Sequence, residues 1–166
     1  LEATGLSLYG AHASLDCAPR VGNGWVLAEM LGVAVDATFS DFAGGHAGVI
    51  GTCGGTFSEL IRRASRELRV EVEAHQHAKA FRRVAIVTGA GGNTVDMDAA
   101  RQAGADTYVT GEGSMYTRMF AKETGLNLIF GTHQATEAPG IRALGQRLGD
   151  HAGIPWEFID ESPDVF

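Results

Sequence analysis

Two pairs of residues in this chain have side chains that can hold a metal ion or move a proton. His12 and Asp16 are four positions apart near the start of the sequence, and His133 and Glu137 are four positions apart near its end. Imidazole nitrogen combined with carboxylate oxygen suits Zn, Fe, Mn or Ni. Carboxylates that bridge favour a two-metal site, with ions ~3.5–4 Å apart, that activates a water molecule. Together the pairs predict a site for two divalent metal ions, if the fold brings them together.

Each pair also has an ordinary structural interpretation. Asp16 can cap the segment that follows it. Glu137 can be a carboxylate in the first turn of a helix, where the helix dipole favours it, with Thr136 as the N-cap and His133 as an unrelated loop residue. Neither pair is decisive without the other.

A glycine-rich loop is a third candidate site. Thr88, Gly89, Gly91 and Gly92 follow an apolar run and precede a helical pattern. Backbone N–H groups in such a loop can surround an anion at a helix N-terminus, which makes these four residues candidates for cofactor binding. The loop lacks the Gly-Lys-Ser/Thr of a P-loop and the full G-x-G-x-x-G spacing, so it does not indicate a nucleotide. A tight strand-to-helix turn is the alternative.

The apolar pattern predicts the elements that must position these residues. Continuous apolar strands separated by helices are typical of an α/β fold with a mostly parallel sheet covered on both faces. Ligands of such sheets collect beyond the carboxyl ends of the strands, where the polar candidates fall. We expect strands at residues 6–11, 47–52, 70–75, 84–87, 107–110, 127–130 and, at an edge, 155–159. We expect helices at residues 24–31, 56–68, 95–103, 114–124 and 137–148.

Three further residues with reactive side chains lie near these strand ends or in polar segments. Glu112 follows the expected strand 107–110 and can add a further carboxylate that surrounds the site without binding the metal directly. His75 and His77 have no third ligand nearby in the sequence, so we expect them to be solvated.

Composition excludes several classes of function. The 166 residues are 45% hydrophobic, which suits one domain, residues 1–166. The net charge of −7 and the absence of a basic run longer than Arg62-Arg63 argue against a nucleic-acid partner. No apolar run approaches the ~20 residues that cross a membrane, and no signal peptide is recognisable. Two cysteines without C-x-x-C spacing fit a reducing compartment, so we expect a cytoplasmic protein.

Taken in order, the motifs resemble one known family. His12-Ala13-Ser14-Leu15-Asp16, Gly22-Asn23 and Leu27-Ala28-Glu29 are similar to its H-T-x-L-D, G-x-N and L-A-E segment. The glycine loop, Val109-Thr110-Gly111-Glu112 and His133-Gln134-Ala135-Thr136-Glu137 are similar to its C-terminal half. The chain thus resembles the NIF-three-like dinuclear metal-centre proteins, also called GTP cyclohydrolase 1 type 2 homologues.

The resemblance implies a NIF-three-like α/β fold, a homohexamer built as a trimer of dimers, and two divalent metals facing an internal cavity. It implies that Asp16, His133 and Glu137 are metal ligands, with Glu137 bridging and His12 beside the site. It also implies that Glu112 and the glycine loop line the site.

Two departures from the family bear on that site. The family's His-His-Pro segment comes before the point where this sequence starts, so each metal would lack one ligand. We therefore expect either a chain truncated at its N-terminus or a degenerate site. In addition, Gly113-Ser114-Met115-Tyr116 stands where many members carry histidines, which weakens the case for a general base there.

Our leading hypothesis is a metal-dependent hydrolase of a small nucleotide-like or heterocyclic molecule, with Glu137 or Glu112 assisting proton transfer. The alternative is a non-catalytic role, as a metal carrier, a hexameric scaffold or a regulatory factor that binds other proteins. A third hypothesis is that the chain binds no metal without the missing segment. A fold does not decide between these functions, and the sequence names neither substrate nor metal.

Overall fold

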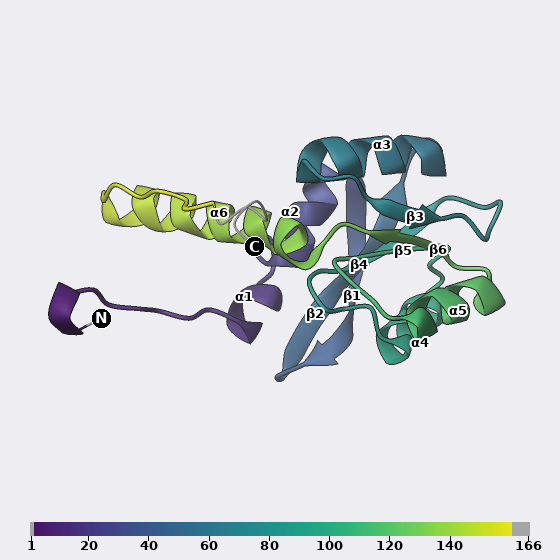
Figure 1. Ribbon diagram of the computed structural model, residues 1–166, viewed down its shortest axis with the longest axis horizontal. Coiled ribbons are helices and arrows are strands. Elements are labelled where there is room, and N and C mark those ends of the chain that lie inside the picture. Colours follow the sequence, from purple (N-terminus) through teal and green to yellow (C-terminus); the bar gives the residue numbers. More distant parts are fainter. Residues whose placement is uncertain (1, 161–166) are drawn as a thin grey trace.

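The computed structural model describes residues 2–160. In this part of the chain, one six-stranded sheet with the order β1-β2-β4-β5-β6-β3 lies between helices (Figure 1). The strands are β1 (Val33–Phe42), β2 (Gly45–Cys53), β3 (Glu73–His75), β4 (Arg83–Val87), β5 (Thr107–Thr110) and β6 (Asn127–Phe130). The helices are the short 3-10 helix η1 (Glu2–Thr4) and α1 (Ala13–Asp16), α2 (Asn23–Met30), α3 (Phe57–Leu68), α4 (Thr94–Gln102), α5 (Met115–Thr124) and α6 (His133–Ala152).

The directions of the strands confirm the predicted α/β class. β4, β5 and β6 are parallel neighbours at the centre of the sheet. β2 is antiparallel to both β4 and β1, and β3 is antiparallel to β6. Four of the six strands therefore point the same way, and the antiparallel pairings lie on either side of the parallel centre.

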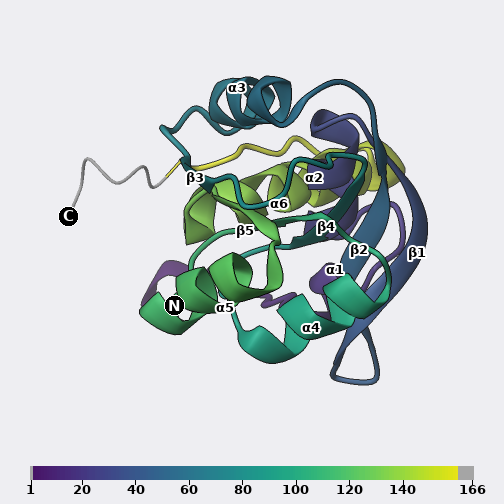
Figure 2. The ribbon, with the colours of Figure 1, turned by 90° about the vertical axis from the view of Figure 1, so that its right-hand side faces the viewer.

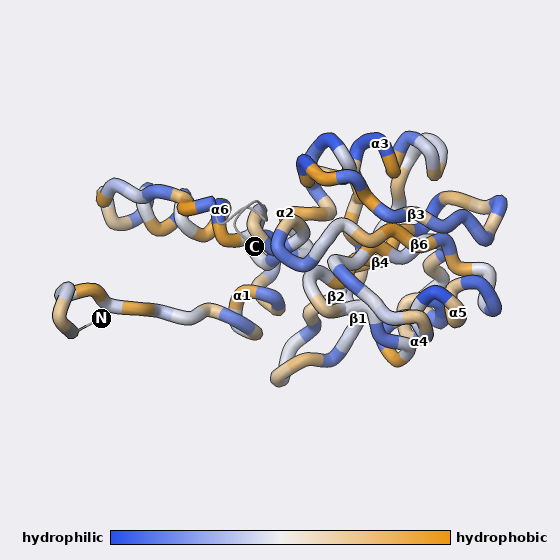
Figure 3. Tube along the Cα trace, viewed as in Figure 1, coloured by the Kyte–Doolittle hydropathy of each residue, from blue (hydrophilic) through white to orange (hydrophobic). Residues whose placement is uncertain are grey.

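Helices bury both faces of the central strands. Val84 and Ile86 of β4 pack with residues of α2 and α3, whereas Ala85 and Val87 pack with residues of α4 and α5. Figure 2 shows α3 on one side of the sheet and α4 and α5 on the other, and Figure 3 shows hydrophobic residues concentrated in the central strands. Successive side chains of a strand point to opposite faces, so a strand buried on both must be apolar throughout, as the sequence predicted.

Side-chain caps define where the helices between the strands begin. The predicted capping box is present at α3, where the Thr56 hydroxyl accepts a hydrogen bond from the Glu59 N–H and the Glu59 carboxylate accepts one from the Thr56 N–H. Asn93 caps α4 by accepting a hydrogen bond from the Asp96 N–H, and Ser114 forms a second capping box with Thr117 at α5. The predicted helices at residues 24–31, 56–68, 95–103 and 114–124 are confirmed to within one or two residues. Within residues 2–160, no helix combines the length and the apolar character that a membrane span requires.

The predicted strand at residues 6–11 is wrong. This segment is extended but pairs with no strand, and it leaves the sheet alongside α6 (Figure 1). Leu8 and Tyr9 are 81% and 84% exposed. An apolar run forms a strand only where a neighbour satisfies its backbone groups, and none of the six strands lies beside it.

The predicted edge strand at residues 155–159 is also wrong. This segment follows α6 back instead, and Trp156 packs against Gly145 and Gly149 of that helix. A Cβ on Gly149 would lie 2.5 Å from a Trp156 ring atom, so the two glycines make room for the indole. The predicted strand at residues 70–75 shortens to Glu73–His75.

The first strand of the sheet was not predicted. β1 and β2 form a long hairpin whose two turn residues, Ala43 and Gly44, have φ angles of +48° and +84°. This is the backbone of a two-residue hairpin turn that matches strand twist. Most of β1 is exposed, so its sequence lacks a continuous apolar run. The hairpin nevertheless brings Ser40 and Phe42 to the site.

Candidate functional site

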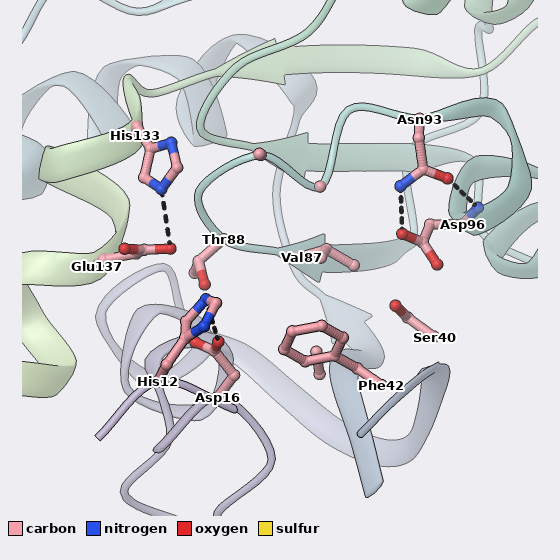
Figure 4. A pocket seen from close by; sticks show the side chains of 13 residues that line it. His12, Asp16, Ser40, Phe42, Val87, Thr88, Asn93, Asp96, His133 and Glu137 are labelled. Atoms are coloured by element: carbon pink, nitrogen blue, oxygen red, sulfur yellow. Dashed lines mark hydrogen bonds and ion pairs between the residues drawn. The ribbon is translucent and has the colours of Figure 1, made fainter. Parts of the chain in front are cut away.

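A cavity of about 310 Å³ lies at the edge of the sheet where β4 ends, and both predicted pairs line it. Figure 4 shows His12 and Asp16 on one side of the cavity, with His133 and Glu137 beside them across Thr88. The fold thus brings together side chains that are more than 100 residues apart. The full lining is His12, Asp16, Ser40, Phe42, Ala47, Val87, Thr88, Ala90, Gly91, Asn93, Asp96, His133 and Glu137.

The first turn of α6 positions His133 and Glu137. The helix begins at His133 and is capped by Thr132, whose side chain accepts a hydrogen bond from the Ala135 N–H. The prediction that Thr136 caps this helix is therefore wrong. Thr136 lies inside the first turn, fully buried, and its hydroxyl accepts a hydrogen bond of 3.0 Å from the Gly89 N–H. That bond joins α6 to the glycine loop.

His133 lies between two carboxylates. Its Nδ1 is 2.9 Å from Oε1 of Glu112, and its Nε2 is 3.3 Å from Oε1 of Glu137. The hydrogen bond with Glu112 raises the pKa of His133 above its ordinary value, outweighing the opposite effect of burial. Burial and the negative charge of Asp16 raise the pKa of Glu137, although His133 partly opposes the shift. The two halves of the site are therefore electrostatically coupled.

Asp16 is held by a neighbouring helix. The side-chain N–H of Asn23, the first residue of α2, donates a 2.7 Å hydrogen bond to Oδ1 of Asp16. His12 is more loosely placed, with its Nε2 3.9 Å from Oδ2 of Asp16 and its side chain 85% exposed, against 11% for Asp16. The Asp16 carboxylate is thus fixed in position inside the site, and the His12 side chain lies at the rim of the site.

Close packing accounts for the glycines of the loop. Gly89 has a φ of +59°, and a Cβ there would lie 2.1 Å from Oε1 of Glu137. Gly91 packs against Val87, and a Cβ on Gly92 would lie 2.1 Å from the Glu112 carbonyl oxygen. The Gly89 N–H already donates to Thr136, so it is not free for an anion. Thr88 and Gly91 line the cavity, and cofactor binding by this loop stays a prediction.

The imidazole and carboxylate groups of the site are of the types that bind divalent metals. They lie as two separate pairs, His12 with Asp16 and His133 with Glu137. Within the described residues, no three His, Cys, Asp or Glu side chains are close enough together to hold a metal ion. The arrangement around His133 is nevertheless typical of a metal ligand: a carboxylate holds one ring nitrogen while the other faces the cavity. The assignment of Asp16, His12, His133 and Glu137 as metal ligands stays a prediction.

Among the lining residues that were not expected at the site from the sequence are Ser40, Phe42 and Asp96. The hairpin brings two of them, and the Ala43-Gly44 turn was the signal that could have revealed it. Asp96 belongs to the first turn of α4, beside the Asn93 cap. Conversely, Glu112 contacts His133 but does not line the cavity, so the geometry favours a positioning role over direct proton transfer.

The fold and the site define an α/β protein with imidazole and carboxylate groups gathered at the carboxyl edge of its sheet. The chain belongs to the family described as Duf34/NIF3 (NGG1p interacting factor 3), which matches residues 1–164. This confirms the resemblance found in the sequence. The chain is 34% identical over 161 residues to the GTP cyclohydrolase 1 type 2 homolog of Deinococcus radiodurans and 32% identical over 163 residues to that of Vibrio cholerae.

Solved structures agree with the family assignment. The chain is similar to protein ybgI, a structural-genomics protein of unknown function, with a TM-score of 0.84 and 31% identity over 93% of this chain and 62% of that one. It is also similar to TTHA1606 from Thermus thermophilus, with a TM-score of 0.76 and 29% identity over 95% and 62% of the two chains. Each of the two sequence relatives covers 93% of this chain, which spans only 59% and 62% of their lengths.

Proposed function

We propose that this chain binds divalent metal through Asp16, His133 and Glu137, and that the loaded site hydrolyses a small heterocyclic molecule. The proposal depends on one observation: the imidazole ring of His133 lies between two carboxylates. Its Nδ1 is 2.9 Å from Oε1 of Glu112, and its Nε2 is 3.3 Å from Oε1 of Glu137. A carboxylate that accepts a hydrogen bond from the Nδ1–H of a ligating histidine orients the ring and raises its basicity.

Each residue of the site has a distinct task in this proposal. With the ring proton on Nδ1, His133 would donate a hydrogen bond to Glu112, and Nε2, which lies 3.3 Å from Oε1 of Glu137, would be left unprotonated to bind a metal. Asn23 orients Asp16. Glu137 is half-buried with a raised pKa, so it is the carboxylate best suited to take a proton from water. A bound divalent ion would supply the lowered pKa of that water.

The oligomeric state and the substrate are also proposals. We infer a homohexamer from family membership alone. Relatives that bear the name GTP cyclohydrolase 1 type 2 homolog support a small heterocyclic substrate, although those proteins are longer than this chain. Metal binding does not depend on either inference.

The test measures metal content and turnover separately. The chain is stripped with EDTA, reloaded with Zn²⁺, Fe²⁺ or Mn²⁺, and analysed for bound metal and for hydrolysis of GTP and guanosine. We expect His133→Ala to lose metal, and His151→Ala, at the exposed end of the same helix, to keep it. Stoichiometric metal without turnover would favour a metal-carrying role. An unchanged metal content in His133→Ala would contradict the proposed site.

A further inference from the structure

We propose that the end of the cavity opposite His133 recognises the ring edge of an uncharged nitrogen heterocycle, as a free base or nucleoside, and does not hold nucleotide phosphates. The inference builds on the proposed function because it names the substrate class of the same cavity. It rests on charge, on unused hydrogen-bonding groups and on one exposed aromatic ring.

The charge of the lining argues against phosphate. Asp16, Asp96 and Glu137 all line the cavity, and no Lys or Arg is among the described residues that do so. The chain as a whole carries a net charge of −7. A site lined by one sign of charge concentrates ligands of the opposite sign and repels those of its own. A di- or triphosphate group would find no Lys or Arg side chain in this lining.

Hydrogen-bond acceptors gather at the end of the cavity formed by α4 and the hairpin. Asn93 donates to Oδ2 of Asp96, and no hydrogen bond within residues 2–160 reaches Oδ1 of the same carboxylate. The hydroxyl of Ser40 likewise has no hydrogen-bond partner in that part of the chain. Figure 4 shows the Ser40 hydroxyl and the Asp96 carboxylate on the same side of the cavity, away from His133 and Glu137. These groups are available to a ligand.

The backbone of Ser40 adds a second observation. Its φ of +64° is in the left-handed region, which non-glycine residues rarely adopt inside a strand. Backbone strain of this kind persists where surrounding structure maintains it, and it is concentrated at functional sites. The backbone conformation of Ser40 therefore has an energetic cost.

Phe42 provides the flat surface for a ring. It is 38% exposed, and the His12 ring meets it edge to face at 5.7 Å and 74°. In Figure 4 the Phe42 ring lies between the Ser40 and Asp96 end and the His12 and Asp16 end. A planar heterocycle stacked there would present one edge to Asp96 and its other side to the proposed metal ligands. A cavity of about 310 Å³ is at the small end of the range for ligand pockets.

The chemistry of the acceptors selects the ring edge. A carboxylate pairs best with two adjacent N–H donors, as on the amide and amino edge of guanine or a pterin. The corresponding edge of adenine presents an unprotonated ring nitrogen, which would face the carboxylate without a proton. The Oδ1 of Asp96, which accepts no hydrogen bond within residues 2–160, would therefore favour the guanine edge over the adenine edge.

The test compares ligands on the metal-free chain by isothermal titration calorimetry, so that no phosphate can bind through a metal. We expect guanosine to bind at least ~10-fold more tightly than GTP or adenosine, and Asp96→Asn to lose at least ~10-fold in guanosine affinity. Asp98→Asn is the matched control, because Asp98 lies on the same helix and pairs with Arg101 at the surface. Phe42→Leu, which leaves Asp96 intact, should also weaken binding.

Two results would overturn the inference: affinity that rises with the number of phosphates, or equal guanosine affinity in Asp96→Asn and Asp98→Asn. Circular dichroism of each variant establishes that α4 is intact. Metal content is measured on separately reloaded samples of the same proteins. In the original chain, normal metal loading without a preference for guanosine over GTP and adenosine would contradict this inference alone, and a preference for guanosine without metal loading would contradict the proposed metal site alone.

Discussion

Gly89 and Glu137 are so close that a methyl group on Gly89 would lie 2.1 Å from the Oε1 of Glu137 and 2.8 Å from the Nε2 of His133. We expect Gly89→Ala to displace both side chains and to abolish metal binding. The positive φ of residue 89 adds a backbone cost of ~1–2 kcal/mol. Metal affinity and urea unfolding measure the two effects separately.

Gly125→Ala is the control for that variant. Gly125 has a φ of +71°, but a Cβ there would meet nothing within 4 Å. The Gly125→Ala variant should lose the same backbone contribution to the free energy of unfolding as Gly89→Ala, and it should keep its metal affinity. If both variants bind metal like the original chain, the position of Gly89 has no bearing on the site.

Glu112→Gln should weaken metal binding by ~10–100-fold, because a neutral amide orients His133 without raising its basicity. Metal affinity from competition with a chelator tests this. Glu123→Gln, an exposed carboxylate on α5, should have no effect. Equal affinities in the two variants would exclude a positioning role for Glu112.

The same variant changes the pH dependence of stability. Since the folded pKa of His133 is raised, its protonated form stabilises the fold below the ordinary value of 6.5, and this contribution disappears as pH rises through the folded pKa. His133 is 47% exposed, so solvent screening keeps the contribution below ~1 kcal/mol. In Glu112→Gln the difference between unfolding free energies at about pH 5.5 and about pH 8.5 should shrink. NMR titration of the ring would show a lower His133 pKa.

Glu73 on β3 and Arg118 on α5 tie the edge strand to the helix through two hydrogen bonds of 2.6 Å. Arg118 is the main reason that the pKa of Glu73 falls from 4.5 to about 2. The lowered pKa stabilises the fold above pH 4.5, and this contribution is lost as pH falls toward 2. Both side chains are about 40% exposed, so Glu73→Gln should cost under ~1 kcal/mol at neutral pH.

Urea unfolding at neutral and acidic pH checks this prediction. The Glu73→Gln variant should differ from the original chain at neutral pH and converge with it near pH 2. Glu67→Gln provides the comparison, because among residues 2–160 the only ion pair of Glu67 is with its sequence neighbour Arg66. A loss in Glu67→Gln as large as that in Glu73→Gln would show that the link between β3 and α5 contributes nothing.

The parts of the fold that follow from local sequence were predictable. Strands buried on both faces are recognisable by unbroken apolar runs, and caps such as Thr56 with Glu59 mark helix starts by side-chain chemistry alone. His133 and Glu137 follow β6, as the rule that ligands collect at strand ends predicted, whereas His12 and Asp16 line the same cavity although residues 6–11 form no strand.

Other parts depend on contacts that no short segment contains. Residues 6–11 have the composition of a buried strand but no neighbouring strand. Thr136 looked like an N-cap because its hydroxyl suits that position, yet the fold turns it toward Gly89. Ser40 and Phe42 reach the site only because β1, with few buried positions, turns tightly into β2. Tertiary pairing decided each of these outcomes.

Asn23 contacts Asp16 and also α6, the helix that carries His133 and Glu137. It donates a hydrogen bond to Asp16, and a Cβ on Gly140 of α6 would lie 2.0 Å from its Oδ1. The distance between the carboxylates of Asp16 and Glu137 thus depends on how α2 packs against α6. These two helices are over 100 residues apart in the sequence. The carboxylate of Asp16 can approach His133 and Glu137 only after α6 has packed against α2. A cation held between these side chains would therefore bind the folded chain alone and would stabilise it against unfolding.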